Sequence, residues 1–279
     1  MTTRTQPSGE QLASSTSPVR VERDGAVVRL VLASAETGNA FDLDFVTALR
    51  RAVEQIVEWT NEPGRGGVGA VLLRAEGRNF SVGGDLKAFV AQGDDIGPYV
   101  TAVAGAAHAA VLGLVGLSVP VIAEIRGAVA GGGVGLALSA DLVVAARSAK
   151  LRLAYTALGL TPDCGASWFL PRLVGERRAL DLTFTNRVVR PTEAEQWGLF
   201  NRVVDEEDLP SATEELAHSL ATGHVHALSR TKLLVRAGRL DELHNHLECE
   251  AEFIADAAAR PEVRAAMRQF LEGSHRGRT

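Results

Sequence analysis

Cysteine is scarce in this chain: Cys164 and Cys249 are the two among 279 residues, far apart and without a CxxC spacing. A disulfide framework is therefore not indicated, and the N-terminus lacks the basic-then-apolar order of a signal peptide, so we expect a cytoplasmic protein. An excess of positive charge is also missing, since the formal net charge is -5 at pH 7. We expect no nucleic-acid partner, because nucleic acid would require a basic face.

Long apolar runs are nearly absent as well, with one exception. Residues 100–123 are almost uncharged, and about 20 apolar residues are enough to span a bilayer. However, this run contains His108 and Pro120, and Pro120 opens a separate β-like run. We therefore expect a buried helix followed by a buried strand, and no membrane partner.

The two ends of the chain differ from its middle. Residues 1–18 are rich in Ser, Thr, Gln and Pro, which predicts a solvated tail without a fold of its own. From about Ala166 onward the strand signal fades, and helical patterns dominate the last 70 or so residues. We place the start of a helical C-terminal subdomain near Thr192 or Leu209, with predicted helices at residues 212–220, 229–236, 241–259 and 262–271.

Between these ends, short apolar strands, glycine-rich turns and helices follow one another repeatedly. Asp24-Gly25 predicts a hairpin turn, and the spacing of apolar residues predicts a helix over residues 42–59. The repeated unit indicates an α/β fold, either superhelical or with a doubly covered sheet. The predicted strands are residues 19–23, 27–32, 70–74, 121–125, 142–146 and 202–204.

Two of the glycine turns share a design. Residues 79–86 and residues 127–136 each follow a predicted strand and precede a helical region. Glycine at such a place lets backbone N–H groups point at a ligand, and two of them converging on one oxygen would form an oxyanion hole. Equally, these glycines could simply permit tight turns and close packing of helix on sheet. The residues alone leave both interpretations open.

The order of motifs resembles the enoyl-CoA hydratase/isomerase, or crotonase, family. The resemblance covers residues 19–209 and implies a superhelix of ββα units over residues 19–208. It further implies a helical C-terminal subdomain, residues 209–279, that takes part in oligomerisation and covers the active site, in a homotrimer or a dimer of trimers. The motifs that carry it are Phe-Ser-x-Gly-x-Asp-Leu at residues 80–86, Gly-x-x-x-Gly-Gly-Gly at residues 127–133, Asn-Ala-Phe at residues 39–41, Gly-Leu-Thr-Pro at residues 159–162 and Ala-Glu-Gln-Trp-Gly-Leu at residues 194–199.

The resemblance also implies a site for an acyl-CoA thioester. The backbone N–H groups of Gly84 and Gly132 would be the oxyanion-hole donors. Coenzyme A would be carried by the substrate, with no prosthetic group and no metal. The implied coenzyme A contacts are the main chain near Ala40 and Asp42 at the nucleotide end, and Asp85, Leu86 and Lys87 along the arm.

This sequence departs from the family at the two glutamates with which hydratases activate water. Those positions fall on Gly135 and Tyr155, both implied to lie in the substrate pocket. A site without these acids cannot deprotonate water by the usual route. Asp163 occupies the position that holds an Asp in double-bond isomerases of the family, and a single carboxylate base suffices for isomerisation. Asp163 could alternatively be the N-cap of the helix that begins near Ala166.

We therefore predict an acyl-CoA isomerase with Asp163 as its base. The alternatives are a hydratase or another enolate-forming enzyme, and a non-catalytic acyl-CoA-binding or regulatory protein. Other patterns are set aside: residues 64–69 fit G-x-G-x-x-G but follow a helix and are predicted to be a loop. The His-x-His pairs at residues 224–226 and 244–246 lack a third ligand, and Cys164 has no His nearby in sequence, so surface histidines and an inert thiol are expected.

Overall fold

The computed structural model of the chain describes residues 17–61 and 67–276. Nearly all of the predicted tail therefore lies outside the described residues. The same holds for the first part of the predicted loop at residues 64–69.

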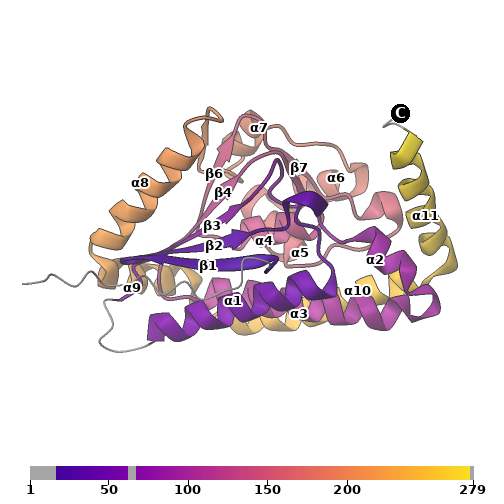
Figure 1. The fold of residues 1–279 in the computed structure, drawn as a ribbon, viewed down its shortest axis with the longest axis horizontal. Helices are drawn as coiled ribbons and strands as arrows, with labels where there is room; N and C mark the ends of the chain where they lie inside the picture. The colour runs from indigo at the N-terminus through magenta and orange to yellow at the C-terminus, as the bar shows by residue number, and fades with distance from the viewer. Residues whose placement is uncertain (1–16, 62–66, 277–279) are drawn as a thin grey trace, which may run out of the picture.

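Six strands form the main sheet, in the order β1-β2-β3-β4-β6-β8 (Figure 1). The first pair is the predicted antiparallel hairpin, whose turn places Gly25 at φ +60°, and all later pairs are parallel. Each predicted strand is confirmed. The strands are β1 (Val19–Asp24), β2 (Val27–Leu32), β3 (Ala70–Ala75), β4 (Val121–Ile125), β6 (Leu142–Ala146) and β8 (Arg202–Val204).

A second, smaller sheet gives the fold its repeat. The parallel strands β5 (Ala128–Ala130) and β7 (Lys150–Arg152) form it, and single bridges between Phe41 and Gly84 and between Ser81 and Val129 extend the pattern. Each of β2, β3, β4 and β6 is thus followed by a short extended segment of this second layer. The predicted α/β superhelix of ββα units is confirmed.

Three long helices cover one face of the main sheet: α1 (Leu43–Asn61), α3 (Ile96–Gly116) and α10 (Leu240–Ala259). They lie side by side below the strands in Figure 1. Within the described ranges, one helical stretch, Gly93–Gly116, is long and apolar enough to cross a membrane, and half of its most apolar window is buried inside the protein. Because α3 packs between α1 and α10, a buried helix followed by the buried strand β4 is what the structure contains, as predicted.

The opposite face of the sheet is covered by α8 (Leu209–Thr222), which packs on β2, β3, β4 and β6. Its apolar side buries Leu209, Ala217 and Ala221 against strand residues. Beneath it lies the carboxylate of Glu124, with a side chain 1% exposed. Glu124 accepts hydrogen bonds from Arg126 at 2.8 Å and from the Thr213 hydroxyl at 2.6 Å, so this buried charge is compensated.

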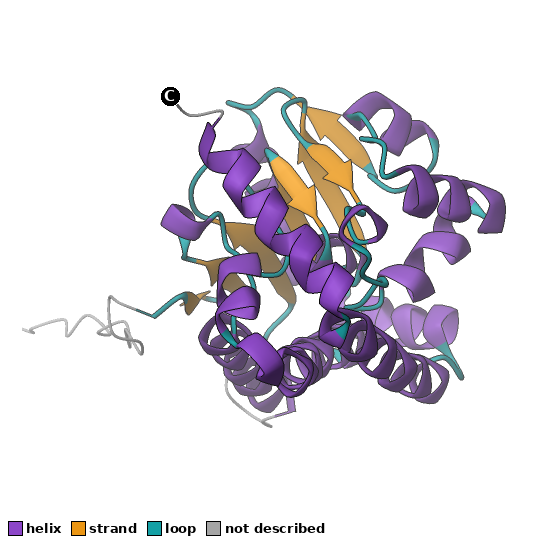
Figure 2. Ribbon diagram, turned by 90° about the vertical axis from the view of Figure 1, so that its right-hand side faces the viewer, coloured by secondary structure: helices purple, strands orange, loops and turns teal. Residues whose placement is uncertain are grey.

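The remaining helices surround the two sheets (Figure 2). One prediction needs correction: the helical region expected after the second glycine turn, from Gly135, already begins at Gly132, so Gly132 and Gly133 lie within the helix and Gly131 is its N-cap. Helix α11 packs against α2 and α10. These helices are α2 (Leu86–Ala91), α4 (Gly132–Leu138), α5 (Ala166–Val174), α6 (Glu176–Thr185), α7 (Pro191–Gln196), α9 (Val225–Arg236) and α11 (Pro261–Arg276).

Candidate active site

A cavity of about 120 Å³ lies where the two glycine turns meet the segment before α5. Helices α10 and α11 contribute Ile254 and Phe270 to its wall. The lining is mostly apolar. Its other members are Phe41, Val82, Gly84, Leu86, Phe89, Val103, Ala107, Gly131, Gly132, Leu153, Ala154, Tyr155, Leu158, Leu160, Asp163 and Cys164.

Both predicted oxyanion donors line this cavity. The bridge between Phe41 and Gly84 uses the N–H of Phe41 and of Asp85, which leaves the Gly84 N–H directed away from that pairing. Gly132 is the first residue of α4, where an N–H has no partner within the helix. Among residues 17–61 and 67–276, neither N–H has a hydrogen-bond acceptor. Both groups are therefore available to donate to an oxygen atom of a ligand.

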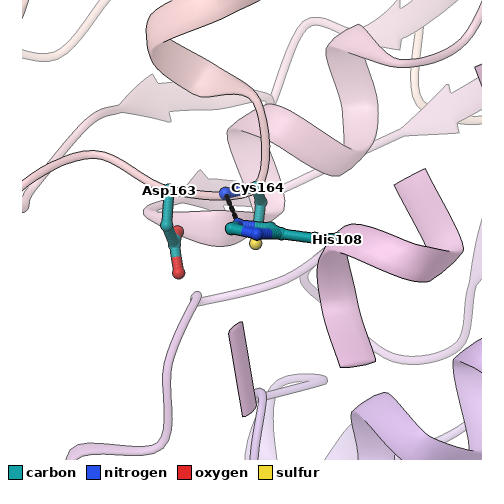
Figure 3. A group of neighbouring side chains, drawn as sticks. All are labelled: His108, Asp163 and Cys164. Carbon is teal, nitrogen blue, oxygen red and sulfur yellow. Dashed lines mark hydrogen bonds between the residues drawn. The ribbon is translucent and has the colours of Figure 1, made fainter. Parts of the chain in front are cut away.

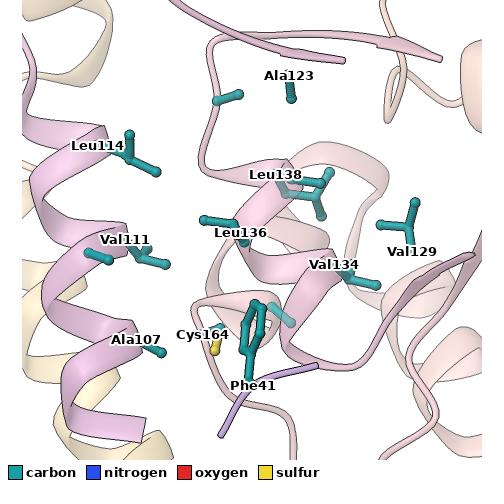
Figure 4. Close-up of a cluster of buried hydrophobic side chains, with 14 of the residues drawn as sticks. Phe41, Ala107, Val111, Leu114, Ala123, Val129, Val134, Leu136, Leu138 and Cys164 are labelled. Atoms are coloured by element: carbon teal, nitrogen blue, oxygen red, sulfur yellow. The ribbon is translucent and has the colours of Figure 1, made fainter. Parts of the chain in front are cut away.

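A side chain at either glycine would clash with residues that line the cavity. A Cβ on Gly84 would lie 2.9 Å from the ring of Phe89. A Cβ on Gly132 would lie 3.0 Å from the sulfur of Cys164 and 3.0 Å from the ring of Phe41. Figure 4 shows Phe41 and Cys164 close together beside α4, with Ala107 of α3 on the other side. The glycines thus serve close packing as well as exposing N–H groups, and the two interpretations of the turns are compatible.

Asp163 is a half-buried carboxylate that faces the same cavity. The Tyr155 hydroxyl donates to its Oδ1 at 2.5 Å. Burial raises the pKa of Asp163 from 3.8 to about 6, the Tyr155 hydrogen bond opposes that shift, and the charge of Glu250 adds to it. Burial also raises the pKa of Tyr155 well above 10, so Tyr155 stays a neutral donor.

Asp163 is not the N-cap of α5. The N-cap residue is Gly165, at φ 78°. Two N–H groups at this helix start, those of Gly165 and Ser167, instead donate to the carboxylate of Glu250, at 2.8 and 3.2 Å. The alternative role considered for Asp163 is therefore not the one that the structure shows, and its carboxylate is left for the cavity.

His108 reaches this region from the middle of α3. It is 5% exposed, and its Nε2 accepts the Cys164 N–H at 3.0 Å (Figure 3). Burial lowers the pKa of His108 to about 4, so the ring is neutral at pH 7. Cys164 thus has a histidine partner that its sequence neighbourhood did not reveal. Its own pKa is raised well above 9 by burial, so the thiol is a poor nucleophile.

His108, Asp163 and Cys164 also form a cluster whose potential ligand atoms lie within 4.8 Å of one another. The lone pair of His108 Nε2 is already engaged by the Cys164 N–H, and Asp163 Oδ1 by Tyr155. A bound metal would have to break both hydrogen bonds. We therefore assign no metal site to this cluster.

The positions of the two missing glutamates differ from each other. Tyr155 lines the cavity, as expected. Gly135 does not line it: Gly135 is buried, and a Cβ there would lie 2.1 Å from the carbonyl oxygen of Cys164. The main chain next to Asp163 therefore fills the space that a side chain at residue 135 would need. A glutamate at this position is incompatible with the observed path of the chain.

The residues implied for coenzyme A lie around the first glycine turn. Among them, Leu86 lines the cavity. Asp85 is the N-cap of α2 and accepts the N–H groups of Lys87 and Ala88. Asp42 accepts the N–H of Phe45 at the start of α1. The carboxylates of Asp42 and Asp85 thus have hydrogen-bond partners at helix starts. Ala40 is buried, and the Lys87 side chain is exposed.

Sequence reasoning missed His108 and Glu250, although a signal for both was present. Each is a polar residue on the apolar face of a long helix. His108 follows Ala104 by four residues in α3, and Glu250 lies between Leu247 and Ile254 in α10. A polar residue in the middle of a buried stripe must have a partner. In α10 that partner is the turn after Asp163, which the sequence places 85 residues away from Glu250.

Comparison with known proteins identifies the family of this chain. The profile of the enoyl-CoA hydratase/isomerase family matches residues 22–276, which is most of the chain. The chain belongs to this family. The match confirms the resemblance drawn from the two glycine turns, and it extends through the helical C-terminal part.

Relatives of this family member include proteins of different activity. It is 32% identical to the 1,2-epoxyphenylacetyl-CoA isomerase of Escherichia coli, over 88% of this chain and 92% of the relative. It is also 32% identical to 4-chlorobenzoyl coenzyme A dehalogenase-1 of an Arthrobacter species, over 73% of this chain and 74% of that one. A monofunctional enoyl CoA isomerase from M. smegmatis matches at TM-score 0.65 with 30% identity, covering 82% of this chain and 99% of that one.

The fold is shared more widely still. The enoyl-CoA hydratase of Bacillus halodurans superposes at TM-score 0.82, covering 91% of this chain and 100% of that structure, with 24% sequence identity.

Proposed function

We propose that this enzyme isomerises the double bond of an enoyl-CoA thioester, with Asp163 as the base that moves the proton. One observation carries the proposal. A single carboxylate faces a cavity that also exposes the backbone N–H groups of Gly84 and Gly132. Moving a proton from one carbon to another needs one base and a place for the negative charge of the enolate, and these groups supply both.

The steps follow from the positions of these groups. The thioester carbonyl accepts the N–H groups of Gly84 and Gly132, and this polarises the adjacent carbon–hydrogen bond. Asp163 removes the proton, the enolate oxygen stays hydrogen-bonded to the two glycines, and Asp163 returns the proton to another carbon. Because Tyr155 donates to Oδ1, the transfer is assigned to Oδ2. A base with a pKa of about 6 is ionised at neutral pH yet basic enough to take up a proton.

Hydration fits the site less well. Residue 135 has no acid and no room for one, and Tyr155, with its raised pKa, donates rather than accepts. Asp163 alone would have to position the water and also exchange its proton. A non-catalytic role in acyl-CoA binding also fits the site less well. A carboxylate with a raised pKa in a cavity is typical of a catalytic site rather than of a site that only binds.

A second candidate is hydrolytic dehalogenation of an aromatic acyl-CoA. It is favoured by the dehalogenase relative and by the same carboxylate, which can act as a nucleophile instead of a base. Asp163 would displace the halide from the ring to form an aryl ester. Water would then hydrolyse that ester, releasing the phenol and restoring Asp163. Phe41 and Phe89 give the cavity two aromatic walls that suit such a ring.

A panel of three substrates tests the proposal. The purified protein is incubated with a 3-enoyl-CoA, with crotonyl-CoA and with 4-chlorobenzoyl-CoA. The isomerase is supported by conversion of the 3-enoyl-CoA to the 2-enoyl-CoA without formation of a hydroxyacyl-CoA. Chloride release from the aromatic thioester would favour dehalogenation, and hydration of crotonyl-CoA would contradict the mechanism. Tight binding without turnover of any of the three would favour the binding protein.

The assembly and the coenzyme A contacts remain part of the proposal. We expect a homotrimer or a dimer of trimers, with the acyl-CoA as the sole carrier of coenzyme A. Light scattering on the purified protein measures the first directly.

A further inference from the structure

The turn that presents Asp163 has an unfavourable backbone. Cys164 and Gly165 follow Asp163 with φ of 54° and 78°, so two consecutive residues occupy the left-handed region. That region costs little for Gly but of order 1 kcal/mol or more for a residue with a side chain, such as Cys164. Such a turn persists only when surrounding groups fix it. The direction of the Asp163 side chain depends on those groups, because Asp163 directly precedes the turn.

The groups that fix the turn come from two other helices. His108 of α3 accepts the Cys164 N–H at 3.0 Å. Glu250 of α10 accepts the Gly165 N–H at 2.8 Å with Oε2 and the Ser167 N–H at 3.2 Å with Oε1. The Ser167 hydroxyl also donates to Oε1. Hydrogen bonds from the N–H groups of Cys164, Gly165 and Ser167 therefore anchor the main chain after Asp163, and Glu250 accepts two of the three.

Glu250 is a buried charge without a Lys or Arg partner among the described residues. It is 4% exposed, and its ion-pair contacts are His108 at 3.8 Å and His246 at 3.4 Å. His108 is neutral at pH 7, because burial lowers its pKa to about 4. The carboxylate is instead compensated by N–H groups at the start of the nine-residue helix α5, where a negative charge is favourable. A buried acid in such a setting is costly, so its presence calls for a role.

We propose that Glu250 is a positioning residue for the reaction, which holds the Cys164-Gly165 turn in its left-handed form and so aims Asp163 at the substrate. The inference rests on the proposed role of Asp163 as the base. It gives α10, which already contributes Ile254 to the cavity wall, a second part in the site that no sequence motif includes. Glu250 does not touch the cavity itself, since it is absent from the lining residues.

The electrostatic consequence points the same way. The titratable groups facing the turn are Tyr155, His108 of α3, and His246 and Glu250 of α10. Of these, Glu250 raises the pKa of Asp163 by its charge, whereas the Tyr155 hydrogen bond lowers it. Removing the charge of Glu250 should therefore lower the pKa of Asp163. The acidic limb of the rate–pH profile should then move to lower pH.

The test compares Glu250→Gln with Glu248→Gln. Gln has the size of Glu, but its amide group places N–H donors opposite a backbone N–H, so one of the two anchors is lost. Glu248 lies on the same helix with a side chain 70% exposed and provides a matched control. A small displacement of a catalytic group costs up to about 100-fold in rate. We expect kcat of Glu250→Gln to fall roughly 10- to 100-fold with KM within about threefold, and the acidic limb to move to lower pH. Glu248→Gln should match the parent.

Two further measurements separate this inference from the proposed function. In protein labelled with ¹³C at the Asp carboxyl groups, the signal of Asp163 is assigned by its loss in Asp163→Asn. Its titration should move to lower pH in Glu250→Gln, whichever reaction the enzyme catalyses. Adding Glu250→Gln to Asp163→Asn should bring no further loss of rate, because a positioning residue acts through the group that it positions.

The inference is overturned if Glu250→Gln lowers the melting temperature but leaves both kcat per folded molecule and the Asp163 titration unchanged. Glu250 would then only stabilise the fold. If Asp163→Asn retains activity while the Asp163 signal still shifts in Glu250→Gln, the proposed function fails and the electrostatic coupling of Glu250 to Asp163 stands.

Discussion

Replacing Asp163 with Asn separates the charge of this side chain from its shape. Asn keeps an oxygen that can accept the Tyr155 hydroxyl, which lies 2.5 Å from Asp163 Oδ1. The amide cannot take up a proton at the pH of any assay. A positioned general base contributes roughly 10²- to 10⁴-fold to the rate. We therefore expect isomerisation of a 3-enoyl-CoA to collapse by that factor while the affinity for acyl-CoA stays within a few-fold of the parent.

Asp163→Asn should lose activity but gain stability. Ionising Asp163 costs more in the folded than in the unfolded chain, because burial raises its pKa from 3.8 to about 6. A shift of about two units corresponds to at most about 3 kcal/mol, and screening of a half-buried group reduces that value. Since the folded pKa is the higher one, the penalty is absent below about pH 4, grows between pH 4 and 6, and is constant above. Asp163→Asn relieves it and should be the more stable protein at pH 8.

Urea unfolding at pH 5 and pH 8 measures the stability, and the initial rate from pH 5 to 9 measures the activity. In the parent, kcat/KM should rise with pH, reach half of its maximum near pH 6 and level off above about pH 7, because the ionised carboxylate is the active form. The reasoning is refuted if Asp163→Asn retains activity within a few-fold of the parent. A stability gain that is as large at pH 5 as at pH 8 would refute the electrostatic part alone.

Three further changes test neighbouring parts of the structure. Tyr155→Phe removes the hydrogen bond that lowers the pKa of Asp163, so the acidic limb should move to higher pH; an unchanged limb in a rate–pH profile would show that the hydroxyl does not contact the base. Gly132→Pro deletes one oxyanion donor and should cost on the order of 10²- to 10³-fold in kcat; circular dichroism checks the fold, and full turnover of a folded variant would remove Gly132 from the site. Glu124→Ala leaves Arg126 and Thr213 without their buried acceptor and should cost about 3 kcal/mol of unfolding free energy, with turnover per folded molecule unchanged; a loss below about 1 kcal/mol in urea unfolding would contradict the compensation.

The long elements of this fold could be predicted because their patterns are long enough to be specific. The apolar run of β4 and the helical spacing of α1 gave boundaries close to those observed. The strands β5 and β7 were missed because β5 lies within the glycine turn at residues 127–136, and β7 has exposed Lys150 and Arg152 on either side of its single buried residue, Leu151. The start of α4 was misplaced because three successive glycines have poor helix propensity. Burial of every residue of α4, rather than propensity, explains that helix.

The site was predictable where it follows from a local motif and not where it depends on distant contacts. Gly84 and Gly132 each lie in a glycine turn whose position after a strand could be seen in the sequence, and the structure brings both to one cavity. The exclusion of a side chain at Gly135 depends on the path of Cys164, and the support of Asp163 depends on His108 and Glu250. Those contacts join segments 29 to 85 residues apart, and the pattern of a single segment does not contain them.

The position of α3 between α1 and α10 has a consequence for the newly made chain. The apolar side of α3 that α10 covers is complete once residue 116 has left the ribosome, but α10 is complete only at residue 259. At roughly 5–20 residues per second, translation of the intervening ~140 residues takes about 7 to 30 s. During that interval the most apolar helix of the protein lacks its cover. A chain under synthesis therefore exposes this side of α3 for longer than a full-length chain that refolds from the unfolded state.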